Sequence, residues 1–102
     1  MGSDGLSDIR HDLANRVAAI EWRAGPARIA DEVDRIRAIA HRHRLLPAVT
    51  VAHLLGSALA RGERGALIHG WLALLREAVV SERQDQGACD AFAAACTVRF
   101  AA

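Results

Sequence analysis

The chain has 102 residues, of which 52% are apolar, and a formal net charge of +1. This length suits one domain with one core, and the apolar content argues against a disordered chain. A charge so near zero argues against generic binding to nucleic acid or a membrane surface, because both need an excess of positive charge. We therefore expect one domain over residues 1–102, with neither a nucleic-acid nor a membrane partner.

The first helix is predicted from a stripe of apolar residues behind a short polar tail. We expect residues 1–5 to be a flexible tail. Beyond them, apolar side chains recur at spacings of three and four, the pattern of one helix face, at Leu6, Ile9, Leu13, Val17 and Ile20. Asp4 or Ser7 carries the side-chain oxygen needed to cap this helix. The first eight residues lack the basic and apolar regions of a signal peptide, which favours a cytoplasmic location.

A Gly-Pro pair separates this helix from a second amphipathic one. Pro26 suits a first helical turn, where its missing N–H has no partner to lose. The buried face is predicted to hold Ile29, Val33, Ile36 and Ala40. Asp31 and Arg35 lie four residues apart and are predicted to pair. The helix ends on four cationic or potentially cationic residues, 41–44, which complement the negative end of the helix dipole.

Residues 45–80 form two nearly all-apolar arms around a polar break at 61–65, and the rest of the chain is organised around them. Each arm has about 15 residues, which indicates a helix rather than a strand and is too short to span a bilayer. Gly62 and Gly65 supply a stop and a restart, and Pro47 suits a first helical turn. This helical hairpin is predicted to supply the core residues Leu55, Leu59, Ile68, Trp71, Leu72 and Leu75.

The last helix follows a polar break at 81–87, in which Asp85 is a predicted cap. One face is predicted to hold Cys89, Phe92, Cys96 and Phe100. Seven residues along a helix separate the two cysteines by about 10 Å, beyond the roughly 7 Å between Cα atoms that a disulfide tolerates. We therefore expect two buried, reduced thiols, which again favours the cytoplasm.

The fold class predicted by these elements is all-α, a single-domain bundle of about five short helices around a central apolar helical hairpin. Short connections predict antiparallel neighbours along the chain. The alanine-rich last helix and the second apolar arm offer more apolar surface than five short helices obviously need to cover each other. A homodimer is therefore an alternative to a monomer, since an isologous contact would cover the excess.

The first helix contains the run His11-Asp12-Leu13-Ala14-Asn15-Arg16-Val17-Ala18-Ala19-Ile20. It resembles the phosphoacceptor helix of sensor histidine kinases, which reads roughly H-[DE]-L-x-[NT]-P-L-x-x-I. The resemblance implies that His11 accepts a phosphoryl group, that Asp12 orients or deprotonates the imidazole, and that Asn15 assists. Arg16 replaces the usual proline, and no glycine-rich nucleotide-binding motif follows. The implied role is therefore a histidine phosphotransfer intermediate, whose partner is a response-regulator receiver domain.

A second histidine lies in the run Ala52-His53-Leu54-Leu55-Gly56-Ser57. This run resembles the H-x-L-K-G-S motif of histidine phosphotransfer domains, which are four-helix bundles, but it is one residue shorter and has no lysine. Because its sequence neighbours are apolar, we predict instead that His53 is buried in the core with a hydrogen-bond partner.

Other chemistry finds little support in the sequence. His41 and His43 are two residues apart and face different sides of a helix, so no metal site is expected. No cofactor motif and no nucleophile paired with a base is recognised. The favoured function is a small regulatory or protein–protein interaction module without catalysis of its own. The alternative is the histidine phosphotransfer intermediate that uses His11, Asp12 and Asn15.

Overall fold

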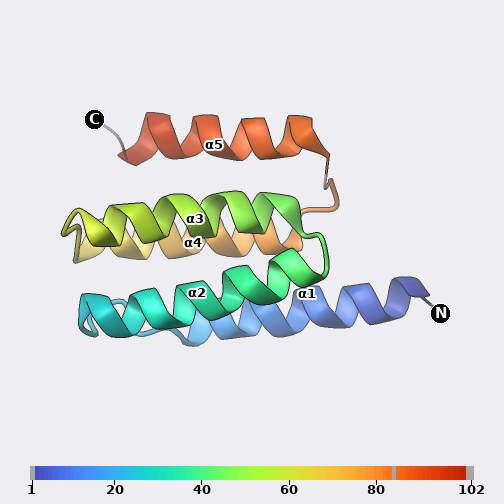
Figure 1. Ribbon diagram of the computed structural model, residues 1–102, viewed down its shortest axis with the longest axis horizontal. Helices are drawn as coiled ribbons and strands as arrows, with labels where there is room; N and C mark the ends of the chain where they lie inside the picture. Colours follow the sequence, from blue (N-terminus) through green and yellow to red (C-terminus); the bar gives the residue numbers. More distant parts are fainter. Residues whose placement is uncertain (1, 84, 101–102) are drawn as a thin grey trace.

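The computed structural model describes residues 2–83 and 85–100, and all the regular secondary structure in them is α-helical (Figure 1). The helices are α1 (Gly2–Ala19), α2 (Pro26–Arg42), α3 (Leu46–Ala60), α4 (Ala66–Val80) and α5 (Gln86–Phe100). The predicted all-α bundle of five short helices is confirmed. In the described part of the chain, no helix is both long and apolar enough to cross a membrane.

The helices run antiparallel to their neighbours in the chain and lie in three layers (Figure 1). α1 and α2 form one outer layer, α3 and α4 the middle layer, and α5 the other outer layer. α1 packs on α4, α2 packs on α3, and α5 packs mainly on α3. The hairpin α3–α4 therefore lies between all the other helices, as predicted, and α1 to α4 alone form an up-down-up-down bundle.

The core is built largely from aliphatic side chains of the middle layer. Leu55, Ile68 and Leu75 have no exposed surface, and Leu59, Trp71 and Leu72 are also buried, which confirms the six core residues predicted from the sequence. The outer helices add the faces that their apolar spacing predicted, with Leu13 and Val17 from α1 and four residues from α2, namely Ile29, Val33, Ile36 and Ala40.

Two helices end in the same backbone arrangement, a left-handed residue followed by a return hydrogen bond to the last turn. After α3, Gly62 has φ +91°, and the N–H of Glu63 donates to the carbonyl of Ala58 at 3.1 Å. After α2, Arg44 has φ +58°, and the N–H of Leu45 donates to the carbonyl of Ala40 at 2.8 Å. Both are Schellman motifs. Gly62 makes the end of α3 recognisable in the sequence, because glycine readily adopts a positive φ. Arginine rarely adopts this conformation, so Arg44 does not mark the end of α2 in the same way.

Three local predictions about the outer helices are wrong. α1 begins at Gly2, so residues 2–5 continue the helix rather than form a tail, and neither Asp4 nor Ser7 stands at its cap position. Each residue added to an existing helix gains one backbone hydrogen bond for the one residue that is fixed. A polar segment without proline can therefore extend the helix at its end. Arg35 lies near Glu32, at 3.8 Å, instead of pairing with Asp31. The interaction spans three residues rather than four, a spacing that also brings helix side chains together.

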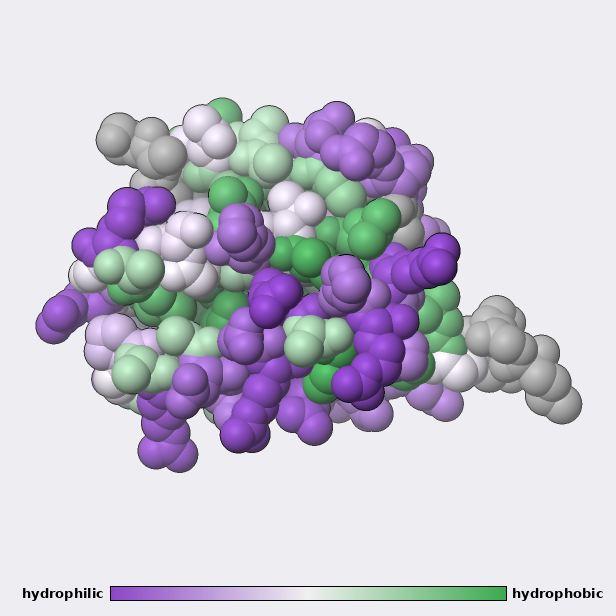
Figure 2. All heavy atoms as spheres, in the orientation of Figure 1, coloured by the Kyte–Doolittle hydropathy of each residue, from purple (hydrophilic) through white to green (hydrophobic). Residues whose placement is uncertain are grey.

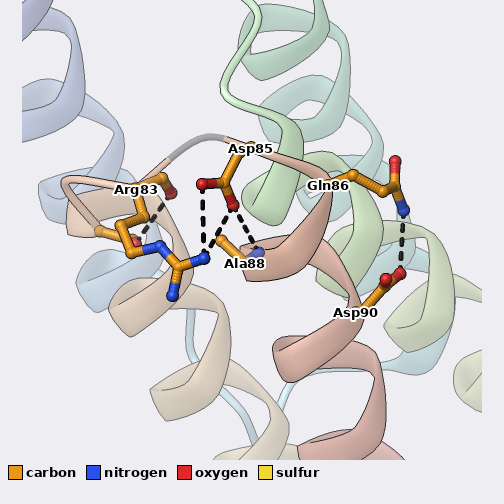
Figure 3. Close-up of polar contacts among 6 residues, drawn as sticks. Arg83, Asp85, Gln86, Ala88 and Asp90 are labelled. Carbon is orange, nitrogen blue, oxygen red and sulfur yellow. Dashed lines mark hydrogen bonds and ion pairs between the residues drawn. The ribbon is translucent and has the colours of Figure 1, made fainter.

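The predicted cap of α5 is confirmed at Asp85 (Figure 3). Its Oδ1 accepts the backbone N–H of Ala88 at 2.8 Å, which satisfies a donor that the first helical turn leaves unpaired. The guanidinium of Arg83 donates to both carboxylate oxygens, at 3.0 and 3.3 Å. The hydrogen bond from Ala88, and then Arg83, hold the pKa of Asp85 below its usual value of 3.8.

Replacing Asp85 by alanine should lower the melting temperature at neutral pH, whereas Asp85→Asn should retain most of the cap because asparagine also caps well. A depressed folded-state pKa means that the ionised carboxylate contributes stability above 3.8, and that this contribution is lost as the pH falls through the lower folded value. Thermal unfolding of the three proteins from neutral to acid pH checks this. If the difference in melting temperature between wild type and Asp85→Ala stays constant from neutral to acid pH, the prediction is contradicted.

Cys89 and Cys96 are both free and buried, as predicted. Phe92 lies on the same face and is partly buried against the core. Burial raises the pKa of the Cys96 thiol, so this side chain stays protonated at neutral pH and behaves as a small apolar group. The side chain of Phe100, the fourth residue of the predicted face, lies outside the described residues.

Candidate functional site

The three residues of the phosphoacceptor resemblance lie together on the exposed side of α1. His11, Asp12 and Asn15 are all solvent-exposed, whereas Leu13 and Val17 point into the core. Asn15 follows His11 by four residues and therefore lies one turn further along nearly the same face. Within the described chain, no hydrogen bond or ion pair joins the three side chains, and the side chain of His11 is exposed to solvent.

The face of α1 that carries His11 continues to the groove between α1 and α4. His11 and Ala18 are seven residues apart, which is two helical turns, so they share one side of α1. Ala18 lines a hollow of about 230 Å³ between these two helices. We call this hollow the α1–α4 groove; its lining consists of Val17, Ala18, Ile20, Trp22, His69, Leu72, Ala73 and Arg76.

Aromatic and cationic side chains gather at one end of the α1–α4 groove. The rings of Trp22 and His69 meet edge to face, with 5.6 Å between centroids and 64° between planes. The guanidinium of Arg23 lies over Trp22, 4.7 Å from the ring centroid, within the range of a cation–π contact. Trp22 thus joins the loop after α1 to α4, and it remains partly exposed.

The α1–α4 groove was not predicted from the sequence. Trp22 lies beyond the apolar stripe of α1, and His69 lies outside the buried face of α4, so periodicity singles out neither residue. The one available signal was a tryptophan followed by an arginine next to a Gly-Pro break. That pattern is too short to show that His69, far away in the chain, completes the cluster.

α4 also exposes a continuous stripe along its length. This outer stripe consists of Ala66, His69, Ala73, Arg76, Glu77 and Val80, all exposed, with Gly70 between them half-buried. A second hollow of about 390 Å³ lies over Ala73, Arg76, Glu77 and Val80. Because Ala73 and Arg76 line both hollows, the outer stripe and the α1–α4 groove form one continuous concave surface.

The prediction of a buried His53 is wrong, because its side chain is exposed on α3. His53 is two residues from both Val51 and Leu55, so it lies about 200° around the helix from each of these fully buried residues. Apolar sequence neighbours suggested burial, but the helical rotation turns His53 outward. It lines a groove of about 550 Å³ between α2 and α3, next to Gly56 and Ser57.

The α2–α3 groove is more polar than the α1–α4 groove. Its α2 side carries Asp31, Asp34 and Arg37, and Arg37 donates to the Oδ1 of Asp34 at 2.7 Å. Figure 2 shows hydrophilic side chains over much of the lower part of this view, where α2 lies. Within residues 2–83 and 85–100, no group of three or more His, Cys, Asp and Glu side chains is placed to hold a metal ion.

Comparison of the chain with protein-family models, curated proteins and solved structures finds no match. The resemblance to the phosphoacceptor helix therefore remains a feature of α1 alone. Among the surfaces described above, the α1–α4 groove combines an aromatic cluster with small apolar residues.

Proposed function

We propose that this protein is a small helical interaction module, and that its binding surface is the α1–α4 groove together with the outer stripe of α4. The observation that carries the proposal is the cluster of Trp22, Arg23 and His69 at the edge of a concave, partly apolar surface. Tryptophan and arginine are among the residues most enriched at the positions that dominate binding energy at protein interfaces.

The shape of the surface supports the same proposal. Ala18 and Ala73 face each other across the α1–α4 groove, and their small side chains leave room for a partner's side chains or backbone. A partner that covers this surface would remove the exposed apolar edge of Trp22 from water. A module of this kind needs no catalytic group of its own, and its two unpaired cysteines fit the cytoplasm as its compartment.

The test compares two arginine substitutions of exposed, helical alanines. Ala73→Arg fills the centre of the proposed surface, whereas Ala38→Arg makes the same chemical change on the exposed side of α2. Both variants should fold, because surface changes usually shift stability by less than about 0.5 kcal/mol. In affinity capture from cell extract, Ala73→Arg should lose the polypeptides that the wild type and Ala38→Arg retain. Equal capture by all three proteins would exclude this surface.

A second candidate function, supported by the exposure of His11, is phosphoryl transfer. A receiver domain seated on the face of α1 that carries His11 would bring its phosphoaspartate to the imidazole. A ring nitrogen would then attack phosphorus, the bond from phosphorus to the aspartyl oxygen would break, and the carboxylate would leave. The resemblance of α1 to the phosphoacceptor helix supports this candidate, and an all-helical scaffold that keeps His11 in solvent is compatible with it.

A further inference from the structure

We infer that the partner of the α1–α4 groove is an amphipathic helix of another protein, with an acidic residue one turn before and one turn after the apolar residues that enter the groove. This inference rests on the proposed function, because it names the partner of the same surface. Its basis is that the groove has an aliphatic floor, has arginines without acidic partners at both ends, and is built only from helices.

Cationic side chains stand at both ends of the α1–α4 groove, and no acidic side chain belongs to its lining in the described part of the chain. Arg76 lines the groove from α4, and the guanidinium of Arg23 lies over Trp22 at the other end. Among the residues that the structure describes, neither arginine forms an ion pair. Glu21 accepts the backbone N–H of Arg23 at 3.1 Å, and it lines the hollow on the α2 side of α1 instead.

A third arginine, Arg10, adds to the positive charge on the α1 side. Arg10 precedes Val17 by seven residues, which is two helical turns, so both lie on one side of α1. It is partly buried, and its Nε is shielded from water and has no hydrogen-bond partner among the described residues. A guanidinium that is partly removed from water attracts a carboxylate more strongly than a fully hydrated one, because the local dielectric constant is lower.

The spacing of the cations matches one face of a helix. His69 and Arg76 are seven residues apart on α4, which is about 10 Å, and Arg23 lies at the His69 end. On a partner helix, residues i, i+3, i+4 and i+7 share one face. Acidic residues at i and i+7 would therefore meet the two cationic ends, while apolar residues at i+3 and i+4 enter the hollow between Ala18 and Ala73.

The helical form of the partner follows from the backbone of the groove. Both sides of the groove are α-helices, whose backbone N–H and C=O groups are paired within each helix, so an extended peptide finds no strand edge to extend. A helix satisfies its own backbone groups and presents only side chains. Ala18 and Ala73 are small, and the distance between packed helices decreases with the size of the side chains at the contact.

A protein helix fits this surface better than a nucleic acid, which is also anionic. The floor of the groove is aliphatic, with Val17, Ile20 and Leu72, and it favours apolar side chains over the polar edges of nucleotides. The formal net charge of the chain is only +1, which gives little general attraction for a polyanion.

Two matched synthetic peptides test the inference. Both are alanine-based helices with two adjacent leucines at the centre. One carries a glutamate one turn before and one turn after the leucines, and the other carries lysine at both positions. In fluorescence anisotropy, the glutamate peptide should bind the wild type at least about tenfold more tightly than the lysine peptide. Equal affinities, no binding of either peptide, or tighter binding of a single-stranded oligonucleotide than of the glutamate peptide overturns the inference.

Charge reversal locates the site of peptide binding. Arg76→Glu should weaken the glutamate peptide at least about tenfold and strengthen the lysine peptide, because the new carboxylate faces lysine. The gain for the lysine peptide also shows that this variant is folded. Arg28→Glu is the matched control, since it makes the same change in net charge at an exposed arginine on the α2 side of α1. It should leave both affinities near those of the wild type. Equal effects of the two substitutions overturn the inference, because binding would then follow net charge alone.

The failure of this inference can be told apart from failure of the proposed function. If Ala73→Arg loses captured polypeptides that Ala38→Arg retains, but the wild type does not prefer the glutamate peptide, the surface binds a partner of different chemistry and only the acidic helix is excluded. If Ala73→Arg changes neither capture nor peptide binding, both the inference and the proposed function are excluded.

Discussion

Replacing Leu75 by alanine is expected to lower the free energy of unfolding by about 2 to 5 kcal/mol, the usual range for removing a large side chain from a packed core. Leu75 lies in the middle layer on α4, has no exposed surface, and belongs to the cluster that includes Leu55 and Ile68. The loss combines the transfer free energy of the deleted atoms with the cavity they leave. Urea unfolding followed by circular dichroism measures it.

Leu67→Ala is the matched control, because it makes the same change eight residues earlier on the same helix. Leu67 is 38% exposed, so its replacement by alanine should cost clearly less than that of Leu75. Both measurements belong at low protein concentration, since any self-association would stabilise the folded state by mass action. A cost below about 1 kcal/mol for Leu75→Ala would show that the hairpin is not the main core.

The five helices and their core were predictable because burial follows the spacing of apolar residues. Leu13, Val17, Ile29 and Val33 repeat at three and four in the sequence, and all four are buried. The break between α3 and α4 was predictable from Gly62 and Gly65, both of which adopt positive φ. In these segments, local preference and tertiary packing select the same structure.

The errors occur where the sequence neighbours of a residue differ from its spatial neighbours. His53 is flanked by apolar residues along the chain, but the helix turns it away from the core. The start of α1 was placed too late because a polar helical turn leaves no apolar periodicity to read. Arg44 ends α2 in a left-handed conformation that its residue type does not indicate.

The candidate surface could be predicted only in part, for the same reason. The outward direction of His11 follows from the helical stripe beside it, and its side chain is exposed. The α1–α4 groove, by contrast, is made by Trp22 and His69, which are separated by α2 and α3 in the chain. Trp22 meets His69 only because α1 packs on α4 as well as on α2. The spacing of apolar residues along a helix does not indicate which other helix it packs on.

Replacing His11 by glutamine should abolish phosphoryl acceptance if α1 functions as its resemblance to the phosphoacceptor helix implies. Glutamine has a similar reach and remains polar, but it has no imidazole nitrogen to attack phosphorus. Folding should be almost unchanged, because His11 is exposed and surface substitutions usually shift stability by less than about 0.5 kcal/mol. The measurement is acid-labile phosphohistidine after incubation with phosphorylated receiver domains.

His53→Gln is the matched control for this experiment, because it removes the exposed imidazole on α3 by the same substitution. Its stability should also stay within about 0.5 kcal/mol of wild type, in contrast to the larger loss expected of a buried histidine. Wild type and His53→Gln should label equally, and His11→Gln should not label. Labelling that survives in His11→Gln but disappears in His53→Gln would move the phosphoacceptor to α3. Absence of label on the wild type from every receiver domain tested would leave the interaction surface of α1 and α4 as the functional part of the molecule.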